Sequence, residues 1–208
     1  MQHNQSPSST NVDPAELEKF SQLAHRWWDP HSEFRPLHEI NPLRLGWIEQ
    51  QVSLAGKDVL DVGCGGGILA EAMARRGARV TGIDLAEKPL KVAQLHLLES
   101  RQEVRYELAS AEEFAERHAG GFDVVTCMEL LEHVPDPAST VAACARLLPK
   151  GTHDYRRFVR PSELARWCRD AGLRTAAMTG MSYNPLTRRY WLGQDCDVNY
   201  LVCCAKDG

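Results

Sequence analysis

The chain has 208 residues, of which 43% are hydrophobic and 25% charged, the composition of an ordinary globular domain. Its formal net charge of -4 gives no sign of a polyanionic partner, so we expect no nucleic-acid binding. No apolar run approaches the roughly 20 residues that a membrane-spanning helix requires. The seven cysteines form no C-x-x-C pair, which argues against a zinc site or a disulfide framework and favours reduced thiols in a cytoplasmic protein.

The chain begins with a polar segment and continues into one domain. Residues 1–12 are rich in Ser, Gln and Asn and predict a disordered lead, without the features of a signal or transit peptide. Residues 13–208 contain no linker or internal repeat and predict a single domain. Asp13 and Pro14 supply the N-cap acid and first-turn proline of a helix. Residues 28–42 hold several prolines and aromatic side chains and predict a loop or lid.

Expected strands and helices then alternate along the chain. The expected strands are 57–62, 79–83, 104–108, 122–127, 173–181 and 198–205. The expected helices are 43–52, 68–76, 88–99, 137–148 and 161–171. This alternation predicts an α/β fold with a doubly wound, mostly parallel sheet.

A glycine-rich loop follows the first expected strand, where residues 59–67 read VLDVGCGGG. Glycine lets another group approach the backbone closely, so such a loop before a helix can hold a cofactor. Gly63, Gly65 and Gly67 have G-x-G-x-G spacing, which differs from the G-x-G-x-x-G of dinucleotide-binding loops. Asp61 would repel a pyrophosphate and suits a cofactor with a cationic amino acid end. The loop resembles motif I of the class I S-adenosylmethionine-dependent methyltransferases; a nicotinamide-dependent dehydrogenase is the weaker interpretation.

Other residues that could bind this cofactor follow the next expected strands. Asp84 comes after the second strand and can accept hydrogen bonds from both ribose hydroxyls. Ser110 and Ala111 follow the third strand and predict an adenine contact, with capping of a helix by Ser110 as the alternative. Met128 follows the fourth strand and could pack on the adenine, lie near the donor sulfur, or belong to the core.

Three titratable residues after the fourth strand predict the acceptor side of the site: Glu129, Glu132 and His133. On one helical turn their i, i+3 and i+4 spacing would place them on a shared face. Two carboxylates and an imidazole could then hold Mg²⁺. Alternatively, His133 could act alone as the general base, because a phenol with a pKa of about 10 needs help to ionise at neutral pH. A solvated turn with a capping histidine is the non-functional alternative.

The chain resembles the ubiquinone-biosynthesis O-methyltransferases, which methylate polyprenyl catechols and demethylubiquinol. The matching stretches are FSQLAHRWW (20–28), FRPLHEINPLRL (34–45), residues 59–70, FDVVTCMELLEHVPDP (122–137), PKGTHD (149–154) and VNY (198–200). The resemblance implies a Rossmann-like class I methyltransferase fold with an antiparallel C-terminal strand. It also implies that Arg44, Gly63, Asp84 and Met128 bind S-adenosylmethionine, with Arg44 suited to the methionine carboxylate. In part of the family, the resemblance favours magnesium at the cluster described above.

The resemblance also implies partners and a location. We expect a polyprenyl phenol or quinol as substrate, a protein complex of ubiquinone biosynthesis as partner, and a cytoplasmic location with weak contact to the inner membrane. Binding to anionic vesicles should be weak, because the sequence contains no evident basic amphipathic helix.

The sequence departs from the family pattern after the helix that ends near Leu148. The family continues there with a fifth strand and a long, partly apolar excursion, whereas this chain passes directly into Pro149. No apolar run lies between Leu148 and Pro161, so we expect the fifth strand to be missing and about thirty residues to be absent. The strand at 122–127 would then have a bare edge or would pair with the last strand across a gap. The absent segment is a natural candidate for part of the acceptor site. A cofactor-binding but non-catalytic partner protein is therefore an alternative function, as is a methyltransferase for another small phenol.

Overall fold

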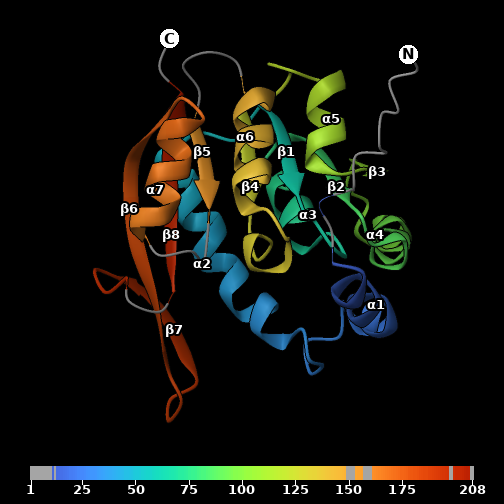
Figure 1. Cartoon of the computed structure of the whole chain (residues 1–208). Coiled ribbons are helices and arrows are strands. Elements are labelled where there is room, and N and C mark those ends of the chain that lie inside the picture. The colour runs from blue at the N-terminus through green and yellow to red at the C-terminus, as the bar shows by residue number, and fades with distance from the viewer. Residues whose placement is uncertain (1–10, 12, 149–152, 157–160, 197–198, 207–208) are drawn as a thin grey trace, which may run out of the picture.

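The computed structural model describes residues 11, 13–148, 153–156, 161–196 and 199–206 (Figure 1). Its helices are α1 (Pro14–Leu23), α2 (Arg35–Gln51), α3 (Ile68–Ala74), α4 (Glu87–Ser100), α5 (Ala111–Arg117), α6 (Pro137–Leu147) and α7 (Pro161–Asp170), with 3-10 turns η1 (Ala24–Arg26) and η2 (Leu131–His133). Its strands are β1 (Asp58–Val62), β2 (Arg79–Asp84), β3 (Val104–Leu108), β4 (Val124–Cys127), β5 (His153–Arg156), β6 (Leu173–Asn184), β7 (Arg189–Gly193) and β8 (Tyr200–Lys206). None of the described helices has both the length and the hydropathy to cross a membrane.

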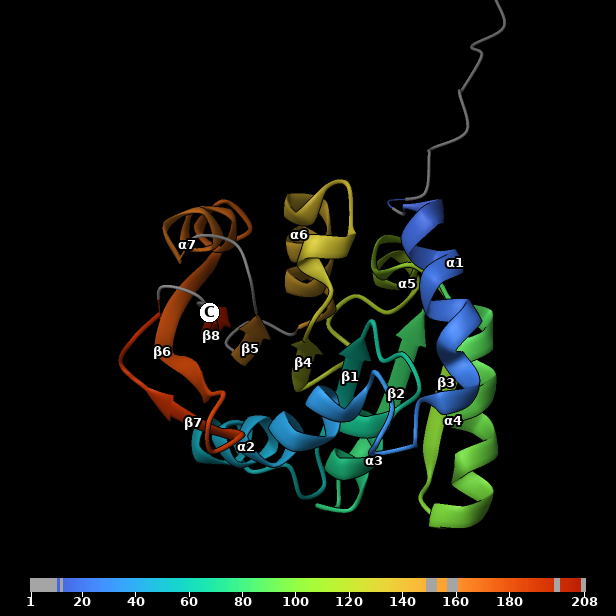
Figure 2. The same ribbon diagram turned by 90° about the horizontal axis from the view of Figure 1, so that it is seen from below.

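The strands form one sheet in the order β3-β2-β1-β4-β5-β8-β6-β7. The first five strands in this order are parallel, whereas β8, β6 and β7 pair antiparallel. Figure 2 shows α5, α6 and α7 on one face of the sheet and α2 and α3 on the other. This arrangement confirms the expected doubly wound, mostly parallel sheet with an antiparallel C-terminal strand, the class I methyltransferase fold. In such sheets, ligands bind beyond the carboxyl ends of the parallel strands.

A hydrophobic core fills both sides of this sheet. On one side, Phe114, Leu147 and Leu164 from α5, α6 and α7 are at most 1% exposed. On the other side, Ile48 from α2 and Met73 from α3 are fully buried against β1 and β2. Because both faces are covered, the strand ends are held rigidly, and they can position a site.

The expectation that β4 has a bare edge is wrong, because β5 fills the position between β4 and β8. Val124 of β4 aligns with His153 in parallel register, and Arg156 aligns with Val202 of β8 in antiparallel register. The sequence of β5, His-Asp-Tyr-Arg, contains no apolar run, so hydrophobic patterning could not identify it. Its assignment rests on backbone pairing with two neighbouring strands. The flanking residues 149–152 and 157–160 lie outside the described residues.

Several further elements differ from the expectations, including α5, which no expected helix covers. Helix α2 begins at Arg35, within the segment that we expected to be a loop, and Pro42 lies inside the helix. Pro36 in its first turn explains part of the difference, since a proline there removes an N–H that has no intrahelical partner. Strand β7 was not expected at all, and it forms a hairpin with the end of β6, which is longer than predicted.

Asn11 belongs to the N-terminal segment that we expected to be disordered, yet its side chain makes several hydrogen bonds. Its Nδ2 donates to Oε1 of Glu112 at 3.1 Å, to the backbone oxygen of Asp136 at 2.7 Å and to Oγ1 of Thr140 at 3.0 Å. The backbone N–H of Asp136 donates back to Oδ1 of Asn11 at 2.8 Å. Asn11 therefore connects the start of the domain to α5 and α6. Residues 1–10 and 12 lie outside the described residues.

Candidate active site

A cavity of about 400 Å³ lies beyond the carboxyl ends of β1, β2 and β4, within the size range of ligand sites. All the predicted site residues except Glu132 line it: Arg44, Asp61, Gly63, Gly65, Asp84, Ser110, Ala111, Met128, Glu129 and His133. These residues come from five separate stretches of the chain, and the fold brings them to one place. The cavity therefore joins the predicted cofactor side and the predicted acceptor side.

The glycine loop is shaped by its left-handed residues and by Asp84. Gly63, Gly65 and Gly67 have φ values of 71°, 51° and 88°, which a residue with a side chain adopts only at a cost. The N–H of Gly65 donates to Oδ2 of Asp84 at 2.8 Å, and the N–H of Ala86 donates to Oδ1 at 2.7 Å. Burial raises the pKa of Asp84, while these backbone donors lower it. Asp84 thus fixes the loop and places its carboxylate at the cavity wall.

Asp61 is the buried acid of the site. Its side chain is 3% exposed, and Oγ1 of Thr126 on β4 donates to its Oδ1 at 2.6 Å. Burial raises the pKa of Asp61 to about 7, although the Thr126 hydrogen bond and the charge of Arg44 act in the opposite direction. A carboxyl group in this state gains most from a cationic ligand, since a positive charge favours its ionised form. Sequence reasoning missed Thr126, which occupies an ordinary strand position.

We expect Asp61 to make the protein less stable as the pH rises. The pKa of Asp61 is 3.8 in the unfolded chain and about 7 in the native state. Below pH 3.8 the side chain is protonated in both states and does not affect the free energy of unfolding. Between pH 3.8 and about 7 the unfolded chain loses this proton more readily than the native protein, so the free energy of unfolding falls as the pH rises. Urea unfolding from about pH 4 to about pH 8 should therefore show a falling free energy of unfolding. Asp61→Asn cannot ionise and should show a smaller fall. An identical pH dependence for both proteins would contradict this account.

Arg44 is a buried cation that holds a carboxylate. The side chain of this α2 residue is only 4% exposed and pairs with the carboxylate of Glu129. Burial lowers the pKa of Arg44, whereas the charges of Glu129 and Asp61 raise it. Its buried Nε has no hydrogen-bond partner among the described residues. The Arg44 site therefore binds a carboxylate group and has a further donor available.

The acceptor cluster is arranged differently from the sequence prediction. Glu129 precedes η2 and has a φ of 53°, so it does not share a helical face with Glu132 and His133. His133 instead lies between two carboxylates: Nδ1 is 2.7 Å from Oε2 of Glu16, and Nε2 is 3.4 Å from Oε1 of Glu132. Among the described residues, no group of three His, Cys, Asp or Glu side chains is placed to hold a metal ion. Nothing in the sequence of α1 had singled out Glu16.

Two tryptophans pack against the glycine loop, and one of them, Trp27, also lines the cavity. Trp27 packs directly against Gly65 and Gly66, where a Cβ atom would overlap its indole ring. The indole N–H of Trp28 donates to the backbone oxygen of Gly66 at 2.9 Å, and its ring stacks on His96 with 3.5 Å between centroids. Trp28, the first residue of the segment predicted to be a loop or lid, therefore helps to hold the glycine loop in place.

This packing predicts the effect of a single methyl group on the loop. Gly66→Ala should lower the free energy of unfolding by about 1–3 kcal/mol, because the new Cβ overlaps the Trp27 ring. The matched control is Gly46→Ala in α2, where nothing lies within 4 Å and alanine should add about 1 kcal/mol of helix stability. Chemical denaturation of both variants measures the difference. Equal stability of the two variants would mean that Trp27 does not pack on the loop as described.

The remaining predicted cofactor residues line the cavity and also have structural roles. Ser110 is the N-cap of α5, where its Oγ accepts a hydrogen bond from the N–H of Glu113 at 3.1 Å. The capping alternative is thus confirmed, and it does not exclude a cofactor contact. Met128 is 6% exposed and belongs to the core on the α2 side while bordering the cavity. Its adenine contact stays a prediction, as does that of Ala111.

The chain is similar to methyltransferases at the levels of domain, sequence and fold. Residues 60–153 match a family model described as a methyltransferase domain. The chain is 63% identical to a ubiquinone biosynthesis O-methyltransferase of Aromatoleum aromaticum over 224 residues, which covers 92% of this chain and 96% of the relative. It is 59% identical to one of Thiobacillus denitrificans over 230 residues, covering 95% and 99%.

The chain belongs to the ubiquinone biosynthesis O-methyltransferase family. Both alignments are longer than this chain of 208 residues, so these family members carry residues that the chain lacks. That difference agrees with the expected absence of a segment relative to the family, although β5 itself is present.

Solved structures confirm the fold of this family member. A magnesium protoporphyrin IX methyltransferase from Synechocystis, solved with bound S-adenosylmethionine, has a TM-score of 0.71. It is 20% identical, and the match covers 95% of this chain and 100% of that one. At this identity, the likeness concerns the fold alone, and the functional argument rests on the family relatives and on the site.

Proposed function

We propose that this chain transfers a methyl group from S-adenosylmethionine to a phenolic hydroxyl of a polyprenyl catechol or demethylubiquinol. The observation that carries the proposal is a cavity lined by buried Arg44 and Asp61, by half-buried Asp84 and by His133. The choice of a quinone-ring substrate follows from the names of the family relatives. The choice of S-adenosylmethionine as methyl donor follows from the charged side chains that line the cavity.

The side chains on the cofactor side match the polar groups of S-adenosylmethionine. Arg44, which already pairs with the Glu129 carboxylate, would hold the methionine carboxylate, and its unpartnered Nε offers a further donor. Asp61 would face the ammonium group and Asp84 the ribose hydroxyls. Gly63 and Gly65 leave room for close approach to the backbone. When bound, the cofactor supplies a sulfonium methyl group that an oxygen nucleophile can displace.

His133 would act as the general base on the acceptor side. Its imidazole can take the proton of the phenolic hydroxyl, which produces the phenolate oxygen that attacks the methyl carbon. Glu16 and Glu132 lie beside the two ring nitrogens and would stabilise the positive charge that the ring gains with the proton. The cavity holds donor and acceptor in one place, and such positioning contributes much of the rate of a displacement reaction.

Magnesium does not fit the side chains as they are arranged. Glu129 is held by Arg44 and His133 lies against Glu16, so the three predicted ligands do not converge. The proposed proton transfer therefore runs through His133, and no step of it uses a metal ion. Activity before and after treatment with a chelator separates this reaction from a magnesium-dependent one: unchanged activity supports the base role, and a loss that Mg²⁺ restores contradicts it.

The substrate also bears on where the protein works. A polyprenyl chain stays in the lipid bilayer, so the proposed enzyme would be cytoplasmic and would contact the inner membrane transiently to reach the quinone ring. Association with other proteins of ubiquinone biosynthesis belongs to the same proposal. None of the described helices is long and apolar enough to cross a membrane.

A second candidate function is a protein that binds the cofactor without catalysing transfer. The shorter length of this chain relative to its family favours that candidate, because the absent residues were expected to contribute to the acceptor site. Methyl transfer to a water-soluble catechol separates the two functions. Product formation supports the enzyme, whereas cofactor binding without any product supports the non-catalytic protein.

A further inference from the structure

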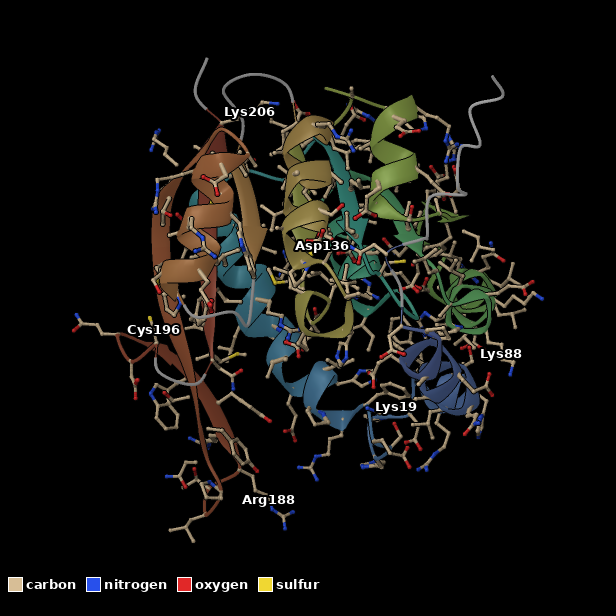
Figure 3. The ribbon with its side chains drawn as sticks, viewed as in Figure 1. Lys19, Lys88, Asp136, Arg188, Cys196 and Lys206 are labelled. Atoms are coloured by element: carbon tan, nitrogen blue, oxygen red, sulfur yellow. The ribbon has the colours of Figure 1, made fainter. Side chains whose placement is uncertain are left out.

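The hairpin formed by β6 and β7 projects from the body of the domain at the end toward which the parallel strands point (Figure 1). In Figure 3, Arg188 lies at its far end, and Lys206 lies at the opposite end of the molecule. The hairpin is held by the packing of β7 against α2 and, closer to its turn, by a tilted contact between the rings of Tyr183 and Tyr190, with 4.5 Å between ring centroids. It is therefore an ordered projection rather than a loose loop.

The tip of this hairpin exposes apolar and aromatic side chains. Leu186 in the turn is 93% exposed, Trp191 is 46% exposed and Tyr183 is 44% exposed. An exposed leucine alone is unremarkable in a soluble protein. Trp191 and Tyr183 add exposed aromatic rings along the two strands of the hairpin, and such amphipathic rings concentrate at the headgroup level of membranes.

The charge of the hairpin differs in sign from that of the whole chain. Residues 181–194 contain Arg188 and Arg189 and no acidic residue, whereas the chain has a formal net charge of -4. Both arginines are exposed. A bilayer with anionic lipids would therefore attract this tip, while repelling much of the remaining surface. Electrostatics would thus orient the molecule with the hairpin toward the lipid.

The hairpin also lies next to the cavity. The N-terminal part of α2 contributes Pro36 and Leu37 to the cavity lining, and the same helix packs against β7. Tyr190 of the hairpin is close enough to Glu39 and Glu129 for their charges to raise its pKa, although burial is the larger cause. A surface that the hairpin touches would consequently lie near the proposed acceptor side.

We propose that the tip of the β6–β7 hairpin is an interfacial anchor that inserts Leu186 and Trp191 among the headgroups of an anionic lipid bilayer. The narrow tip fits this partner better than it fits a protein, because a stable protein interface buries roughly 800 Å² on each side. We expected weak vesicle binding because the sequence has no evident basic amphipathic helix. That expectation did not consider a β-hairpin as the membrane-binding element. The benefit for catalysis rests on the proposed function, but the binding itself does not.

Cosedimentation of the full chain with lipid vesicles tests the charge of the anchor. Binding should be stronger with phosphatidylcholine plus phosphatidylglycerol than with phosphatidylcholine alone, and added salt should weaken it. Replacing Arg188 with Asn, which tolerates its φ of 52°, and Arg189 with Ser should lower the vesicle affinity about 30-fold. The matched control, Arg166→Ser with Arg169→Ser on α7, removes the same charge elsewhere and should leave the affinity unchanged.

A second pair of variants tests the apolar contact. Leu186→Asp should lower the vesicle affinity about tenfold or more, because a charge replaces the inserted side chain. Leu98→Asp on α4 is the control, since Leu98 is 79% exposed on another part of the surface and should have no effect. The proposal is overturned if the hairpin variants bind as the unmodified protein does, if the controls lose as much affinity, or if the unmodified protein binds neither kind of vesicle.

Methyl transfer to a water-soluble catechol distinguishes failure of the anchor from failure of the proposed function. The hairpin variants should retain that transfer, since their changed residues lie outside the cavity lining. They should lose transfer to a polyprenyl acceptor in anionic vesicles. If the unmodified protein binds vesicles but transfers to no acceptor, the proposed function fails and the anchor stands.

Discussion

Replacing His133 with alanine is expected to lower kcat for methyl transfer by about 10² to 10⁴-fold, the usual contribution of a general base. The physical reason is that a phenol with a pKa of about 10 is almost fully protonated at neutral pH. Without the imidazole, the reaction must wait for the small phenolate fraction in solution. Steady-state kinetics with a soluble catechol measure the effect. Calorimetry with S-adenosylhomocysteine should show that the cofactor side still binds.

The pH profile of His133→Ala distinguishes the loss of a base from general damage. The rate of the variant should keep rising with pH toward the pKa of the phenol, and added imidazole should restore part of the activity. Glu16→Gln is the companion variant, because Glu16 lies 2.7 Å from Nδ1 of His133 and would act through that ring. Its kcat should fall less than that of His133→Ala. A His133→Ala variant with unchanged kcat would remove His133 from the mechanism.

Replacing Asp84 with alanine is expected to weaken S-adenosylmethionine binding by about 10²-fold or more. Each charge-assisted hydrogen bond to a ribose hydroxyl contributes about 1.5–3 kcal/mol, and Asp84 can accept two. The same carboxylate also accepts hydrogen bonds from the N–H groups of Gly65 and Ala86. In Asp84→Ala these bonds are lost, so the glycine loop would lose its fixed shape as well. Isothermal calorimetry with S-adenosylhomocysteine measures the affinity.

Two controls keep the Asp84 prediction specific. Asp58→Ala removes an exposed acid at the opposite end of β1, where its ion pair with Arg79 is worth little. That variant should bind the cofactor normally. Thermal unfolding of Asp84→Ala shows whether the domain stays folded. Unchanged affinity in a folded Asp84→Ala protein would contradict the assignment of Asp84 to the cofactor.

The shape of the glycine loop and the position of Asp84 could be predicted from the sequence because their signals are local. Gly63, Gly65 and Gly67 adopt positive φ, a conformation that glycine favours and that the residue type alone therefore suggests. The position of Asp84 follows from the rule that parallel strands end at the same edge of a sheet. The Asp84 prediction required only the order of the strands, which hydrophobic alternation provides.

The acceptor side could not be predicted as well because it depends on contacts between distant segments. Glu16 lies on α1, more than a hundred residues before His133, and no pattern links the two. The prediction that Glu129, Glu132 and His133 share one helical face is wrong, because Glu129 adopts a φ of 53°. That conformation depends on its tertiary surroundings. Its carboxylate pairs with Arg44 on α2 rather than with its neighbours in sequence.

Strand β5 shows the limit of hydrophobic patterning. Its residues 153–156 are polar or aromatic, and the strand is defined by ladders to β4 and β8. The sequence argument that a segment is absent after Leu148 agrees with the greater length of the relatives. The conclusion that the sheet would therefore have a gap was wrong, since a short strand suffices to join β4 to β8.

The most direct test of the central claim is methyl transfer by the unmodified chain from S-adenosylmethionine to a short-chain demethylubiquinol, followed by mass spectrometry of the product. The account predicts a product that is heavier by one methylene unit and methylated on oxygen. His133→Ala should not form it at a comparable rate, although it binds the cofactor. Cofactor binding by the unmodified chain with no methylated product would contradict the claim that this shorter family member is an enzyme.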